Sequence, residues 1–237
     1  MVNMPGFDDA IARAGSEAPA LRLGLHLNLI AGAPVSVVPS LTDPATKQFW
    51  PFAALLRRAS LGQVAAADIT RETDAQFARL RATGVRITHV DSHRHTHIHG
   101  ALWPAVVAAA ARAGVDTVRI PREPLFTNAT HWRAMITKLL LGASGIAHRA
   151  GVRTPDHFTG ISLQGIADFR AGLLGALKAL QPGTTELMVH PGYVDDVLRA
   201  QDAYQAPREA EVRALIDPAV RALIAARGIA LVNFDGL

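Results

Sequence analysis

The chain has no cysteine among its 237 residues. Disulfide frameworks and thiolate chemistry are therefore excluded, and any metal ion must be held by nitrogen and oxygen ligands. No apolar run approaches the roughly 20 residues that a helix needs to cross a bilayer. The first residues, MVNMPGFDDAIARAG, have neither the basic nor the apolar segment of a secretory signal. These absences favour a cytoplasmic protein in a reducing compartment.

Aromatic residues are also scarce, at 5% of the chain, whereas apolar residues as a whole make up 49%. A sizeable core can form, but Ala, Leu, Val and Ile must fill most of it. The formal charge of +4 is small, and no block of Lys and Arg indicates a nucleic-acid-binding arm. The glycine-rich phosphate loops of nucleotide-binding folds are absent as well.

Apolar patterns separated by Gly and Pro predict strands that alternate with helices. The predicted strands are 21–29, 85–93, 115–120, 158–163, 185–190 and 229–234. The predicted helices are 6–16, 67–83, 101–113, 130–149, 165–180 and 207–227, and a proline-containing loop covers 32–51. This alternation predicts an α/β domain with a parallel sheet, either open or closed into a barrel.

Polar residues gather near the carboxyl ends of the predicted strands, where parallel α/β folds place their functional groups. They are His26 and Asn28, Asp91 and His93, Arg119 and Arg122, and His190. Histidine at the ends of several otherwise apolar strands indicates a site rather than chance.

The segment THVDSHRHTHIHG, residues 88–100, carries histidine at every second position from His89 to His99, with Asp91 inserted. Alternate residues of a strand share one face, so His89, Asp91 and His93 are expected to lie together. Imidazole and carboxylate are the usual nitrogen and oxygen ligands of Zn²⁺ and other divalent ions. Should the chain turn helical after residue 93, His93 and His97 would form an i, i+4 pair. The remaining histidines would then orient ligands or contact substrate.

Isolated histidines need a plainer interpretation. His131, His148 and His157 are expected to be surface or hydrogen-bonded core residues. For His26 the two interpretations are evenly matched, because a histidine in an apolar strand must satisfy two ring nitrogens. The sequence VHPGY around His190 favours a functional role.

Three motifs together resemble the YdjC-like carbohydrate deacetylase family: GLHLN at 24–28, THVDSHRHTH at 88–97 and ELMVHPGY at 186–193. Their order and spacing extend the resemblance over essentially the whole chain. VRIPREPL at 118–125 is most similar to the hopanoid-biosynthesis branch of that family, called HpnK.

The resemblance implies a distorted, TIM-like (β/α) barrel and a carbohydrate N-deacetylase, a hydrolase of linear amide C–N bonds. It implies a divalent metal on His26 and His93, with Mg²⁺ expected and Zn²⁺ as the alternative. The substrate would be an acetylated amino sugar, which in the hopanoid branch is an N-acetylglucosaminyl lipid. A lipid-linked substrate would bring the protein into peripheral contact with a membrane, and the Leu-rich segment 134–141 is either core or lipid-facing. A homodimer is left open.

The chain departs from the family pattern at its start. Family members begin with a strand that ends in Asp-Asp-Phe-Gly and supplies a carboxylate, and MVNMPGF matches the family only after that segment. Asp8 and Asp9 lie in a predicted helix and do not replace it. The expectation is one deacetylase domain over 1–237, N-terminally incomplete, with impaired metal binding and catalysis.

Each candidate residue has an expected role in the deacetylase hypothesis. Asp91 would either take a proton from the attacking water or orient a ligand histidine, and His190 would protonate the departing amine. The expected substrate contacts are Arg119, Arg122, Tyr193, Asp195, His95 and His97. The two arginines are equally well interpreted as ion-pair partners, and His95 and His97 as reserve metal ligands.

Three other functions compete with this hypothesis. A metal-dependent phosphoesterase would need several basic groups around one phosphate. A metal-buffering module would bind several ions per chain and tolerate loss of His26 and His190. An inactive homologue would bind sugar or metal without cleaving an amide.

Overall fold

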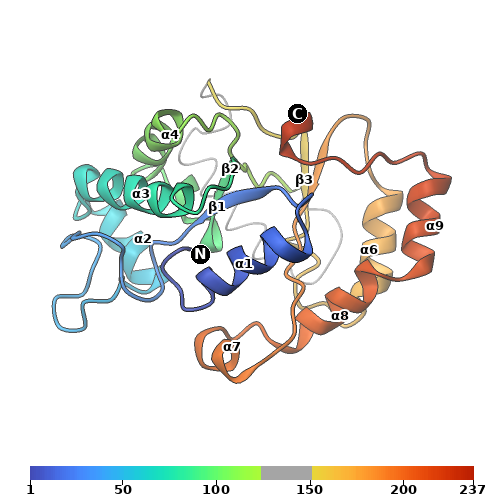
Figure 1. Ribbon diagram of the computed structural model, residues 1–237, viewed down its shortest axis with the longest axis horizontal. Helices are drawn as coiled ribbons and strands as arrows, with labels where there is room; N and C mark the ends of the chain where they lie inside the picture. Colours follow the sequence, from blue (N-terminus) through green and yellow to red (C-terminus); the bar gives the residue numbers. More distant parts are fainter. Residues whose placement is uncertain (124–150) are drawn as a thin grey trace. The chain divides into compact units, whose positions relative to one another are not determined.

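The described residues, 1–123 and 151–237, form two units in this computed structural model (Figure 1). The first unit comprises residues 1–120 with 151–154 and 233–237, and the second comprises 121–123 with 155–232. Each is built on a two-stranded parallel sheet. The predicted helix 130–149, the segment 134–141, His131 and His148 lie outside the described residues.

In the first unit, β1 (Leu23–Leu27) pairs in parallel with β2 (Ile87–Ser92). The surrounding helices are α1 (Phe7–Glu17), α2 (Phe52–Ser60), α3 (Ala66–Arg81) and α4 (Trp103–Arg112), and a 3₁₀ helix, η1 (His93–Ile98), follows β2 directly. The predicted strand 115–120 contributes isolated bridges only, Val90 to Val118 and Thr117 to Arg153. These bridges still place residue 119 beside the end of β2.

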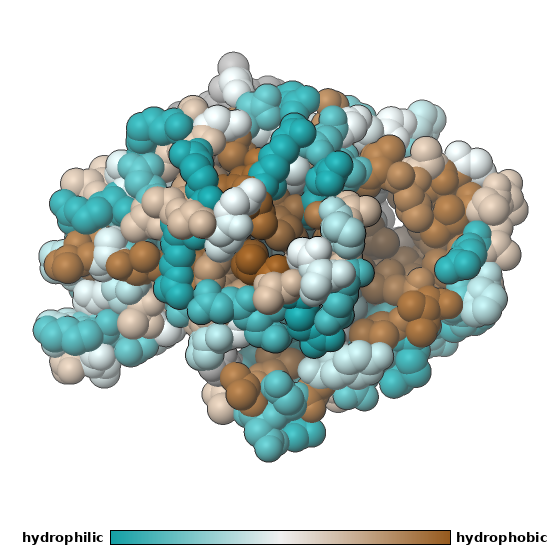
Figure 2. Space-filling model, viewed as in Figure 1, coloured by the Kyte–Doolittle hydropathy of each residue, from teal (hydrophilic) through white to brown (hydrophobic). Residues whose placement is uncertain are grey.

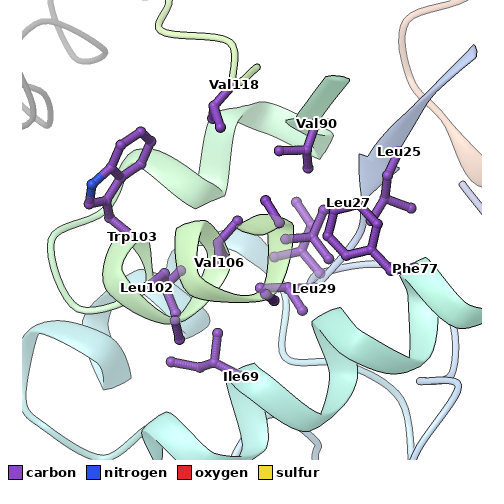
Figure 3. Packing of buried hydrophobic residues seen from close by; sticks show 14 of the residues in the cluster. Leu25, Leu27, Leu29, Ile69, Phe77, Val90, Leu102, Trp103, Val106 and Val118 are labelled. Carbon is purple, nitrogen blue, oxygen red and sulfur yellow. The ribbon is translucent and has the colours of Figure 1, made fainter. Parts of the chain in front are cut away.

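The core of this unit is formed by apolar side chains of β1, β2, α3 and α4, together with residues of the loops between them. Leu25, Leu27 and Leu29 are fully buried, and Figure 3 shows them packed with Phe77 of α3 and Val106 of α4. Three apolar residues of α3 are all buried: Ile69, Phe77 and Leu80. Gly84 and Gly114 follow α3 and α4 with φ of +81° and +70°, the left-handed conformation that ends a helix.

Helix α3 also buries polar side chains that fix the loop after β1. Glu72 is fully buried and accepts hydrogen bonds from the amides of Val35 and Ser36, both at 2.9 Å. Gln76 donates to the carbonyl of Asn28 at 2.7 Å and accepts from its amide at 3.1 Å. The predicted loop 32–51 has no helix or strand, and these bonds give it a defined shape.

In the second unit, β3 (His157–Thr159) pairs in parallel with β4 (Thr185–Leu187). The helices are α6 (Phe169–Lys178), α7 (Asp196–Gln201), α8 (Ala206–Leu215) and α9 (Pro218–Ala226). Leu163, Phe169, Leu173, Leu177, Ala214 and Val220 make a separate, smaller core. Figure 2 shows hydrophobic surface gathered over α6 and α9, and Ile216 of this unit is 71% exposed.

Several predicted elements differ from the structure. Residues 229–234 are not a strand, and Leu231 is 79% exposed. The predicted helix 207–227 is two helices, because Pro218 has no amide hydrogen to continue α8 and Asp217 caps α9 by accepting from Ala219 at 2.7 Å. Helices α2 and α7 were not predicted. The described residues form two separate two-stranded sheets, and no closed barrel is seen among them.

The turn after β2 breaks the alternation of the histidine segment. Arg94 and His95 have φ of +52° and +54°, a conformation that costs of order 1–3 kcal/mol for a residue with a side chain. The turn buries His97 completely, with Nδ1 2.6 Å from Ser92 Oγ and Nε2 2.8 Å from the carbonyl oxygen of Arg119. His97 therefore joins β2 to the segment that carries Arg119.

We expect His97 to make stability depend on acid pH. Burial lowers the pKa of His97 from 6.5 to about 4, so the unfolded chain binds the proton more tightly than the folded chain. The contribution of His97 to the free energy of unfolding is fully present above pH 6.5 and falls as the pH drops towards 4. Between pH 7 and pH 5 the loss should be about 2 kcal/mol from this residue. Urea unfolding at the two pH values measures it, and His97→Asn should shrink the difference; an unchanged difference would contradict the assignment.

A second prediction concerns Gly24 in β1. A Cβ at this position would lie 2.3 Å from Cε1 of His89, whose ring stacks on Phe234 with centroids 3.8 Å apart. Gly24→Ala should therefore cost about 1–3 kcal/mol of unfolding free energy. Gly15→Ala is the control, because nothing lies within 4 Å of a Cβ there, and in helix α1 it should stabilise by about 0.5–1 kcal/mol. Equal effects in chemical denaturation would refute the steric explanation.

Candidate active site

His26 and Asp91 are register partners in the parallel β1–β2 pair. His26 Nδ1 lies 2.9 Å from Asp91 Oδ1. The adjacency follows from the sequence pattern, because both residues stand near the carboxyl ends of neighbouring parallel strands. Since Asp91 engages Nδ1, a ligand of His26 would bind Nε2.

Arg119 completes this cluster from the segment beside β2. Its guanidinium donates to Asp91 Oδ2, so both carboxylate oxygens have partners. The side chains of Arg119 and Asp91 are only 13% and 8% exposed. Burial raises the pKa of Asp91, but its interactions with His26 and Arg119 outweigh burial and hold the pKa well below its usual range. Asp91 is therefore an anion at neutral pH that orients the His26 ring.

His93 lies next to this group at the first position after β2. Its ring centroid is 5.8 Å from that of His26, and the two rings meet edge to face. A carboxylate behind a histidine is the usual support of a metal-binding imidazole. The donor chemistry of His26 and His93 thus fits one divalent ion. Within the described residues, no three His, Asp or Glu side chains gather in a metal-binding arrangement.

The other histidines of the segment are placed differently. His89 stacks on Phe234, and burial lowers its pKa to about 4. Burial also lowers the pKa of His95 well below its usual value. His97, predicted to contact substrate, is fully buried with both ring nitrogens in hydrogen bonds, so no ring atom can reach a substrate in this structure. His99 Nε2 lies 3.1 Å from Ser60 Oγ.

His190, in the second unit, lies just beyond β4 and is partly exposed. The side-chain nitrogen of Gln164 is 3.2 Å from His190 Nδ1, and the ring of Tyr204 meets it edge to face at 5.6 Å. The carboxylate of Glu211 accepts the backbone N–H of His190. Sequence reasoning identified His190 and missed these three neighbours, because nothing in their local patterns distinguishes them from ordinary helix and loop residues.

The predicted substrate contacts of this unit fall into two groups. Tyr193 is 80% exposed, and Arg122 is also exposed. Asp195 instead caps α7, where Oδ1 accepts from the amide of Leu198 at 2.8 Å. Its other oxygen remains a candidate for substrate contact.

Glu123 was also missed, although it directly follows Arg122. It is buried and accepts from the amides of Gly160 at 2.9 Å and Ser162 at 3.0 Å, and from the Ser162 hydroxyl at 2.6 Å. It therefore fixes the backbone at the end of β3.

Across the described residues, no helix is both long and apolar enough to cross a membrane.

Comparison with known proteins assigns the chain to a family. The model of the YdjC-like protein family matches residues 1–226. A carbohydrate deacetylase of Brevibacillus brevis is 31% identical, with 100% of this chain and 86% of the relative covered. A chitooligosaccharide deacetylase of an Enterobacter species is 32% identical over 99% and 84% of the two chains.

A solved structure from Enterococcus faecalis, described as a cellobiose-phosphate cleavage protein, superimposes with a TM-score of 0.78. The two chains are 28% identical, and the match covers 100% of this chain and 85% of the other. The sequence motifs, the family match and the structural likeness agree, and the chain belongs to the YdjC-like protein family.

Proposed function

We propose that this protein is a metal-dependent carbohydrate deacetylase that removes the N-acetyl group from an amino sugar such as a chitooligosaccharide unit. The observation that carries the proposal is the pair His26 and His93, with Asp91 oriented against His26. The relatives named carbohydrate and chitooligosaccharide deacetylases support the substrate class.

The metal would be held by His26 and His93. When bound, such an ion polarises an amide carbonyl and lowers the pKa of a coordinated water. Two imidazoles favour Zn²⁺, because Mg²⁺ prefers oxygen ligands. The family resemblance favours Mg²⁺, so both ions need to be compared by titration.

The chain's own residues have distinct roles in this proposal. Asp91 keeps His26 oriented and is fixed by Arg119, which makes both of them positioning residues. His190 donates a proton to the amine nitrogen as the C–N bond breaks, because an amine leaves poorly without one. Tyr193 and Arg122, both exposed, offer an aromatic face and hydrogen-bond donors to a sugar.

A finer proposal is that the acetylated sugar is carried on a hopanoid lipid. It rests on VRIPREPL at 118–125, most similar to the hopanoid branch. Acetate release from an N-acetylglucosaminyl lipid, compared with a chitooligosaccharide, tests it. Phosphate release from a sugar phosphate, without acetate release from either substrate, would favour a phosphoesterase instead.

His26→Ala and His93→Ala should each abolish high-affinity binding of one divalent ion and reduce acetate release by at least about 100-fold, because each removes a ligand. The His157→Ala variant is the control, since that ring bonds only the exposed carbonyl of Pro182 at 3.1 Å among the contacts described. Isothermal titration with Zn²⁺ and Mg²⁺ measures binding independently of activity. Parental binding in either ligand variant would refute the assignment.

His190→Ala should separate proton transfer from metal binding. We expect the variant to bind the divalent ion with parental affinity while kcat falls about 10²- to 10⁴-fold, the usual contribution of a general acid. Steady-state kinetics and the same titration measure both quantities. Loss of the ion would make His190 a ligand, and a parental kcat would remove it from catalysis.

A further inference from the structure

We propose that helix α8 is a clamp that positions His190 for proton transfer through its backbone. The clamp consists of Glu211, Arg208 and Tyr204, the last lying just before the helix. This inference rests on the proposed role of His190 as proton donor, and it assigns these residues to positioning and not to contact with substrate.

Beyond the end of β4, hydrogen bonds to the side chains of the clamp take the place of the backbone hydrogen bonds of the sheet. Strand β4 stops at Leu187, and Met188 makes one further ladder bond, from its amide to the carbonyl of Thr159 at 2.8 Å. The N–H of His190 bonds instead to the carboxylate of Glu211. Glu211 is only 1% exposed, and a buried carboxylate is retained where hydrogen bonds compensate for its lost hydration.

Arg208 holds the other backbone group of the same residue. Its guanidinium donates to the carbonyl oxygen of His190 at 3.4 Å, and further bonds to Asp202 Oδ2 and the carbonyl of Tyr204, both at 2.6 Å, fix its position. Arg208 and Glu211 are three residues apart and so share one face of α8. On that face, Glu211 therefore binds the N–H of His190, and Arg208 binds its C=O.

Tyr204 connects the clamp to the imidazole ring. Its hydroxyl donates to Glu211 Oε1 at 2.5 Å and accepts from the amide of Gly165 at 3.2 Å. Its ring meets the ring of His190 edge to face. Pro191 also restricts the backbone of His190 to extended conformations. Backbone and ring are thus fixed by one network.

The expected consequence is a loss of rate without a matching loss of substrate affinity. A misplacement of about 1 Å at a reacting group can cost on the order of 100-fold in rate. Substrate binding by exposed groups such as Tyr193 would change little. A role in folding alone would lower the fraction of active protein and leave kcat per folded molecule unchanged.

The test compares Glu211→Ala, Glu211→Gln and Tyr204→Phe with the parent chain, using acetate release from a chitooligosaccharide. Glu211→Ala should lower kcat about 10- to 100-fold, with KM within about threefold. Glu211→Gln should recover most of the loss, because an amide oxygen still accepts the His190 N–H. Tyr204→Phe keeps the ring and should lower kcat less than Glu211→Ala. Arg213→Ala is the control, since that side chain is 70% exposed on the same helix, and it should match the parent.

A second readout does not depend on activity. The backbone amide hydrogen of residue 190 should exchange slowly in the parent and faster in Glu211→Ala and Glu211→Ala/His190→Ala, while core amides of α6 remain protected. The double variant should also release acetate no more slowly than His190→Ala alone. Parental kcat or unchanged exchange at residue 190 in Glu211→Ala would overturn the clamp. Parental activity of His190→Ala would overturn the proposed role of His190, and the exchange result would still show whether Glu211 holds that backbone.

Discussion

The buried anion at Asp91 is the constraint on which the first unit depends. Its two oxygens are shared between His26 and Arg119, so β1, β2 and the segment after Val118 meet at one charge. Removing Arg119 would leave the buried carboxylate of Asp91 without its guanidinium partner, and breaking a buried ion pair in this way typically costs about 3–5 kcal/mol. The same bonds orient the histidine that the proposed chemistry needs. Stability and site geometry therefore depend on one interaction.

The central part of this site could be predicted from the sequence. Strand alternation and the rule for carboxyl ends place His26, Asp91 and His93 together, because both are local properties of the backbone. After His93 the sequence left a helical turn only as a possibility, and the chain does form the 3₁₀ helix η1, but with a kink that the sequence did not predict. At this kink Arg94 and His95 adopt positive φ, a conformation that no pattern of side chains signals. His97 therefore became a buried bridge rather than a substrate contact.

The buried carboxylates on and between helices could not be predicted. Glu72 and Glu211 occupy helix positions whose neighbours resemble ordinary solvated charges, and Glu123 follows a loop arginine. Each accepts backbone N–H groups from a segment distant in sequence: residues 35 and 36, residue 190, and residues 160 and 162. A satisfied buried charge depends on which loop folds over it, and this is tertiary information that a local pattern lacks.

These carboxylates explain how such short strands can support a site. Strands β3 and β4 are three residues long, so few ladder bonds hold the segments that follow them. A hydrogen bond to a charged group contributes about 1.5–3 kcal/mol, compared with about 1 kcal/mol for a neutral one. One carboxylate that binds two or three groups can therefore stand in for several ladder bonds at the end of a strand. At residue 190 the carboxylate of Glu211 binds the backbone N–H, so this bond does not occupy the imidazole that the proposed chemistry needs. In this fold, buried carboxylates thus extend the rigidity of the sheets into the loops without adding residues to the strands.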